Sequence, residues 1–169
     1  MHVRVYDVNK NDFMAEVINF RYASLDELLS ESDIVSLHVP YNKFTHHLIN
    51  KENISKMKTG AILINTARGA IVDTDALFEA LQSGKISGAG LDVIEGEDLI
   101  KEEKALLHDT GNPEKWRAIV RDQKIFKMDN VVFTPHNAFN SREALMRILD
   151  TSIGNIEGFL DGKGKNLVG

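Results

Sequence analysis

The chain has 169 residues and a formal net charge of −5, a length at which one domain can bury a core. Hydrophobic residues make up 43% and charged residues 27%, an ordinary balance for a globular protein. The acidic balance and the scattered lysines and arginines disfavour nucleic acid or an anionic membrane as a partner, because binding phosphates requires a basic surface. There is no cysteine, which excludes disulfides and thiolate metal sites.

The N-terminus lacks the apolar segment of a signal peptide, and no apolar run approaches membrane-spanning length. We therefore expect a single cytoplasmic domain over residues 1–169, with no membrane partner and no bound metal.

Short β-prone apolar runs alternate with helical segments along the chain. Strands are predicted at residues 3–7, around Phe20, and at 33–39, 61–65, 88–93 and 131–133. Helices are predicted from residue 24 onward, where Ser24 and Glu27 form a capping box, and at 50–57, 74–83, around 116–121, and at 141–160, where Ser141 is the cap. This alternation predicts an α/β fold with a parallel sheet.

Three polar residues stand out because each follows a predicted strand. They are Arg68 in NTARG, Glu97 in LDVIEGE and His136 in TPHNA. In an open parallel sheet, ligands bind beyond the carboxyl ends of the strands. A cation, a carboxylate and an imidazole converging there could hold and reduce a small 2-keto acid.

Four ordered motifs carry a family resemblance: SDIVSLHVP at 32–40, INTARGAIVD at 64–73, GLDV at 90–93 and TPH at 134–136. With them the chain resembles the NAD-binding domain of the D-isomer-specific 2-hydroxyacid dehydrogenases, in particular the D-lactate dehydrogenase-like branch. The resemblance implies a Rossmann-like parallel sheet with flanking helices, NAD as cofactor, a small 2-keto or 2-hydroxy acid as substrate, and a homodimer formed through the cofactor domain.

For the reaction, the resemblance implies that Arg68 holds the substrate carboxylate and carbonyl, since a guanidinium can make two parallel hydrogen bonds to a carboxylate. His136 would give the proton, and Glu97 would orient it and favour its charged form. Without the motif, Arg68 is equally well a helix-capping or salt-bridging arginine. Among the other histidines, His46 and His47 are interpreted as surface residues, with His47 also a weak candidate for a cofactor loop.

The carboxylate partner of His136 has two candidates. In the family it lies five residues after the strand aspartate, here Asp92, which selects Glu97. Glu95 is the fallback, and an unspecific acidic loop is the alternative to both.

Six residues are predicted to bind the cofactor. Asp7 ends the first strand, where dinucleotide folds place an acid on the adenine ribose, and its charge favours NAD over NADP. The alternative for Asp7 is a turn-forming aspartate. The resemblance places Val39 and Pro40 at the adenine side, and Thr66, Ala67 and Asp92 near the nicotinamide. Val39 could instead be core, and Asp92 a strand-end cap.

Two observations separate close relatives. Formate dehydrogenases, which look similar, have a glutamine where Glu97 stands. The phosphoglycerate branch has a shorter path between its glutamate and histidine than the stretch from residue 97 to 136 here. Lactate-type 2-hydroxy acids are therefore the predicted substrates.

Family members are about twice this length, and their substrate-binding domain and Gly-x-Gly-x-x-Gly turn have no counterpart in residues 1–169. That turn follows the strand that lies at the middle of the sheet. We expect one of three outcomes: a fragment of a longer enzyme, a gap closed by a second copy, or detachment of the first two strands. Weak NAD binding and little turnover are expected of this chain alone. The alternative function is a non-catalytic dimerisation or nucleotide-sensing module.

Overall fold

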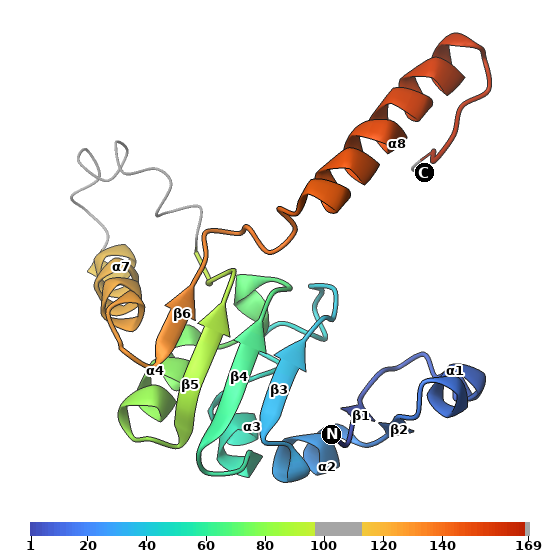
Figure 1. The fold of residues 1–169 in the computed structure, drawn as a ribbon. Helices are drawn as coiled ribbons and strands as arrows, with labels where there is room; N and C mark the ends of the chain where they lie inside the picture. The colour runs from blue at the N-terminus through green and yellow to red at the C-terminus, as the bar shows by residue number, and fades with distance from the viewer. Residues whose placement is uncertain (97–112, 168–169) are drawn as a thin grey trace. The chain divides into compact units, whose positions relative to one another are not determined.

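The computed structural model describes residues 1–96 and 113–167, shown in Figure 1. The chain divides into two compact units, Met1–Pro135 and His136–Gly169, which are described separately. Among the described residues, none of the helices is both long enough and apolar enough to cross a membrane.

The first unit is built on a parallel sheet whose strands follow one another in chain order. Its strands are β3 (Ile34–Leu37), β4 (Ala61–Asn65), β5 (Ile86–Leu91) and β6 (Val131–Phe133). Every neighbouring pair is parallel, and the register brings Leu37, Asn65, Leu91 and Phe133 to the same edge. The α/β fold with a parallel sheet is confirmed. All four predicted strands are present, with differences of a few residues at their ends.

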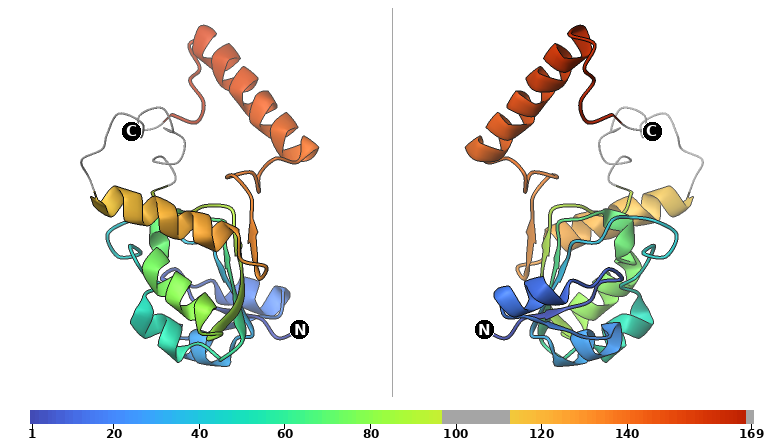
Figure 2. Two further views of the ribbon diagram at one scale, coloured as in Figure 1. Left: turned by 90° about the vertical axis from the view of Figure 1, so that its left-hand side faces the viewer. Right: turned by 90° about the vertical axis from the view of Figure 1, so that its right-hand side faces the viewer.

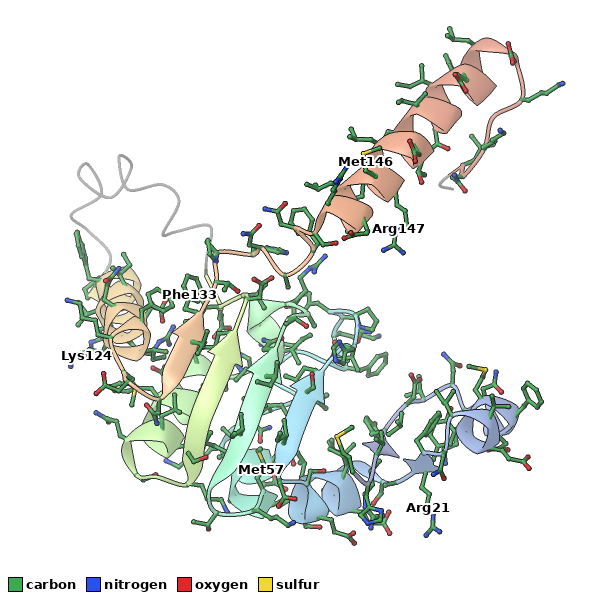
Figure 3. The ribbon with its side chains drawn as sticks, viewed as in Figure 1. Arg21, Met57, Lys124, Phe133, Met146 and Arg147 are labelled. Carbon is green, nitrogen blue, oxygen red and sulfur yellow. The ribbon has the colours of Figure 1, made fainter. Side chains whose placement is uncertain are left out.

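Helices of the first unit cover one face of this sheet (Figure 2). They are α3 (Lys51–Lys56), α4 (Thr74–Gln82) and α7 (Pro113–Phe126). The side chains of Val35, Leu63 and Leu91 point toward these helices, and each of the three residues is at most 3% exposed. On β6, the Phe133 ring lies 4.1 Å from the Phe126 ring of α7 (Figure 3).

The opposite face carries apolar side chains that the described part of this unit leaves open. Ile34, Ile62 and Val132 are 60%, 37% and 69% exposed. Alternation along each strand therefore separates a buried face from an open one, as the two-residue period of a strand requires.

The first two strands form a sheet of their own. β1 (Arg4–Val5) and β2 (Arg21–Tyr22) pair in parallel and are joined by α1 (Asp12–Val17). Helix α1 was not expected from the sequence; the Asn11 side chain caps it by accepting from the Met14 amide. Neither strand pairs with β3 to β6 in the described chain, which is the arrangement expected if the first two strands detach.

Helix caps agree closely with the sequence. α2 (Leu25–Glu31) begins with the predicted capping box, in which Ser24 Oγ accepts from the Glu27 amide and Glu27 accepts from the Ser24 amide. In the second unit, Ser141 Oγ accepts from the Ala144 amide at the start of α8 (Arg142–Leu160), as predicted. Figure 3 labels Met146 and Arg147 on this helix, whose apolar residues are largely exposed within the described chain.

Candidate active site

Arg68 lies just beyond β4, in a turn that the buried Asn65 side chain holds. Asn65 is 1% exposed; its Nδ2 donates to Arg68 O over 3.0 Å, and its Oδ1 accepts from the Ala67 amide over 3.1 Å. The Arg68 side chain itself is exposed, and its Nη1 donates to Ala67 O over 2.6 Å. The turn therefore presents a fixed backbone and a guanidinium in contact with solvent. Asn65 was predicted only as a strand residue, although its place in NTARG marks it as the last residue before the turn.

Gly69 brings the turn after β4 into contact with the chain after β5. A Cβ at Gly69 would lie 2.1 Å from Ile94 C and 2.4 Å from Glu95 N, so any other residue would displace one of the two backbones. The Arg-Gly pair of the motif thus has a steric explanation. The predicted acidic loop begins after β5. Because Gly69 has no side chain, the first residues of this loop can lie against it, directly after Arg68.

Asp92 and Thr134 continue the sheet beyond its strands. The Asp92 amide donates to Asn65 O and the Thr134 amide to Leu91 O, each over 2.9 Å. Thr134 Oγ1 also donates to Asp92 Oδ1 over 2.5 Å, and Asp92 is 3% exposed. The aspartate is thereby held at the strand ends on the same edge as Arg68. The role of the Thr134 hydroxyl was missed, although its position just before Pro135 and His136 was a usable signal.

His47 and Glu95 form a pair that the sequence did not predict. His47 Nε2 and Glu95 Oε1 are 2.8 Å apart, and the two side chains are 33% and 30% exposed. His46 stacks on His47 with ring centroids 4.0 Å apart. Among the described residues, the fallback carboxylate Glu95 is therefore engaged by His47, which is more than a surface residue.

The three predicted reacting residues do not all fall in one described unit. Arg68 belongs to the first unit, His136 begins the second, and Glu97 lies outside the described residues. His136 is half-buried and has a φ of +53°, the left-handed region. Their convergence remains a prediction.

The predicted cofactor residues fall into two groups. Val39 and Pro40 follow β3, Thr66 and Ala67 follow β4, and Asp92 follows β5, so five of the six lie past the carboxyl ends of three adjacent strands. Asp7 follows β1 in the separate sheet, is exposed, and accepts from the Asn9 amide over 2.8 Å in a turn. Within the first group, Thr66, Ala67 and Asp92 follow the neighbouring strands β4 and β5, and Asp92 is buried whereas Thr66 is exposed. The sequence holds no Gly-x-Gly-x-x-Gly turn for the pyrophosphate.

Comparison with known proteins identifies this arrangement. Residues 1–138 match the family described as "D-isomer specific 2-hydroxyacid dehydrogenase, NAD binding domain". A "D-specific alpha-keto acid dehydrogenase" of Enterococcus faecium is 45% identical over 138 residues, which cover 82% of this chain and 41% of that protein. A "Hydroxypyruvate reductase" of Blautia hydrogenotrophica is 38% identical over 168 residues, covering 99% of this chain and 46% of that protein.

The structural comparison agrees. The D-lactate dehydrogenase of Aquifex aeolicus, solved with NAD and lactic acid, superposes with a TM-score of 0.83 and 45% sequence identity, over 96% of this chain and 47% of that one. The chain thus spans about half the length of the relatives that it matches. The chain belongs to the D-isomer specific 2-hydroxyacid dehydrogenases, a family of NAD-dependent enzymes, and contains their NAD binding domain.

Proposed function

We propose that this chain supplies the NAD-binding part of an enzyme that interconverts a lactate-like 2-keto acid and the corresponding D-2-hydroxy acid. The observation that carries the proposal is the turn after β4, where Asn65 holds the backbone of an exposed Arg68 beside the strand end that bears Asp92. An exposed, permanently charged guanidinium on a fixed backbone is suited to binding a substrate carboxylate.

In this proposal Arg68 fixes the substrate by its carboxylate and carbonyl. His136, in its protonated form, donates a proton to the carbonyl oxygen, and Glu97 keeps that form favoured by its negative charge. NADH, when bound, supplies the hydride that the carbonyl carbon accepts, so hydride and proton together convert the ketone into an alcohol. In the reverse direction neutral His136 takes the proton back.

NAD would be held by Val39 and Pro40 on one side and by Thr66, Ala67 and Asp92 at the nicotinamide, with Asp7 on the adenine ribose. Asp92 accepts a hydrogen bond from Thr134 Oγ1, which gives its carboxylate a fixed direction. Because the sequence lacks the Gly-rich turn, we expect the chain alone to bind NAD weakly and to turn over slowly or not at all. The homodimer and the cytoplasmic location stay predictions from the sequence.

The alternative is a non-catalytic dimerisation or nucleotide-sensing module descended from such an enzyme. The separation of β1 and β2 from the main sheet favours it, since Asp7 then lies apart from the other cofactor residues. Tight binding of NADH without any turnover would support this alternative, because the proposed function predicts weak binding by the chain alone.

The test is a fluorescence titration with NADH, followed by pyruvate-dependent oxidation of NADH by the same sample. His136→Ala is expected to lower turnover by about 10²–10⁴-fold, the usual contribution of a positioned acid. Arg68→Lys should raise KM for pyruvate by about tenfold, because an ammonium cannot make the paired hydrogen bonds. The matched control is Arg21→Lys on β2, which is expected to change neither value (Figure 3). Equal activity of all three variants and the original chain would refute the proposed roles.

A further inference from the structure

The pair of His47 and Glu95 joins two loops that are 48 residues apart in the sequence. The distance between His47 Nε2 and Glu95 Oε1 is 2.8 Å, and about a third of each side chain is exposed. A carboxylate can only accept a hydrogen bond, so the Nε2 of His47 carries the proton of this contact. The contact therefore requires a proton on His47 Nε2 and fixes the direction of the Glu95 carboxylate.

The segment that begins with Arg68 lies between these two loops. On one side the His47 amide donates to Ala70 O over 2.9 Å, and the Ile49 amide donates to Ile71 O over 3.0 Å. On the other side the backbone of residues 94–95 lies against Gly69, too close for a Cβ. The side-chain pair thus connects the two walls that enclose the residues directly after Arg68.

This arrangement brings the backbone of Glu95 against the residue that follows Arg68, the arginine proposed to bind substrate. Glu95 N is within contact distance of Gly69, the residue adjacent to Arg68. Among the described residues, Arg68 makes no ion pair, and its Nη1 donates to a backbone carbonyl. An arginine and a carboxylate pair readily through two parallel hydrogen bonds, and such a pair would occupy the groups that a substrate carboxylate needs.

Arg121 already has two carboxylate partners among the described residues. Arg121 of α7 lies 3.0 Å from Asp75 and 2.9 Å from Asp122. Burial raises the pKa of Asp122, and the charge of the Glu95 carboxylate adds to that rise. His47 is therefore the described partner that engages Glu95 directly.

We propose that His47 is a positioning residue that engages Glu95 and so keeps the Arg68 guanidinium available to the carboxylate of the substrate. The inference rests on the proposed role of Arg68. Removal of His47 would release Glu95, which would then compete for Arg68, whereas simultaneous removal of the Glu95 charge would end the competition.

The test compares His47→Ala, Glu95→Gln and the double variant with the original chain. The first readout is the Nε–H signal of Arg68 in the ¹⁵N NMR spectrum, recorded without substrate or cofactor. We expect His47→Ala to shift this signal and slow its exchange with water, and the double variant to return it to its original position. His46→Ala, which removes the stacked neighbour but not the contact with Glu95, is the matched control and should leave the signal in place.

The second readout is the KM for pyruvate. His47→Ala is expected to raise this KM about fivefold with little change in kcat, because a partly exposed ion pair between Arg68 and the released Glu95 would be weak. The double variant should lower the KM again. A purely structural pair would instead make the double variant as impaired as His47→Ala, and that result would overturn the proposal. So would an Arg68 signal that does not respond to His47→Ala. If the original chain turns over too slowly to give a KM, the Arg68 signal alone decides on the inference.

Discussion

The two sheets of the first unit have the same parallel pairing but very different support. The sheet of β3 to β6 has strands of three to six residues over a buried core, whereas β1 and β2 have two residues each. None of residues 1–28 is buried, and the described core begins with Leu29, which is 0% exposed. A strand-forming sequence is therefore not enough to make a stable sheet. A strand also needs neighbouring strands that pair with its edges and neighbouring elements that bury its apolar side chains.

Few interactions hold β1 and β2 together. The Arg21 and Ala23 amides donate to Val3 O and Val5 O over 3.2 and 2.9 Å, and the rings of Phe20 and Tyr22 meet edge to face at 5.1 Å. A two-stranded sheet alone is marginally stable in water. We expect the β3 to β6 sheet to determine the free energy of unfolding, and β1 and β2 to contribute little to it.

The largest expected effect tests this contrast directly. Leu63→Ala on β4 removes a side chain that is 0% exposed, and should lower the free energy of unfolding by about 4 kcal/mol, as is typical for a buried leucine. The matched change on β1, Val5→Ala, should cost less than about 1 kcal/mol, because Val5 is only half-buried. Both values come from urea unfolding followed by circular dichroism. Equal costs would mean that the two sheets form one cooperative core.

A second, intermediate effect concerns α7, which packs on the larger sheet. Burial raises the pKa of Asp122 above its usual value of 3.8, with the carboxylates of Asp75 and Glu95 adding to the rise and Arg121 opposing it. The folded chain then holds this proton more tightly than the unfolded chain. The protonated Asp122 carboxyl therefore stabilises the folded chain at low pH. This contribution to the free energy of unfolding is lost as the pH rises from 3.8 through the raised pKa of the folded state.

Asp122→Asn removes this titration. The stability of the variant relative to the original chain should therefore rise with pH across that window, as measured by urea unfolding at a series of pH values. Gln123→Ala, at the exposed and uncharged neighbour of Asp122 on α7, is the control and should leave the pH dependence of the original chain unchanged. A relative stability of Asp122→Asn that falls with pH would contradict the raised pKa.

The smallest effect lies at the boundary between the two sheets, where α2 begins. Ser24→Ala removes the side-chain cap of α2 and should cost about 1 kcal/mol. Ser30→Ala is the control, since the Ser30 hydroxyl only donates to Glu27 O within the same helix. Thermal unfolding of both variants measures the difference. An equally small change in both would show that α2, like β1 and β2, lies outside the cooperative core.

Local patterns allowed much of the fold to be predicted. The six strands and the capping residues Ser24 and Ser141 follow from the period of apolar residues and from side chains that bond to nearby amides. Helix α1 was not predicted because it is short and buries no residue, so it has no clear apolar pattern. The family motifs also led to Arg68 and Asp92, since both lie shortly after the end of a strand.

The amino-acid sequence by itself thus determined the class of fold, the family and the strand ends that carry the proposed site, because these depend on short stretches of chain. Only the tertiary structure decided that His47 engages Glu95, that Thr134 holds Asp92, and that Gly69 lies against residues 94–95. Each of these contacts joins segments that are 25 residues or more apart. Such contacts depend on the order and register of the strands, which no local pattern encodes.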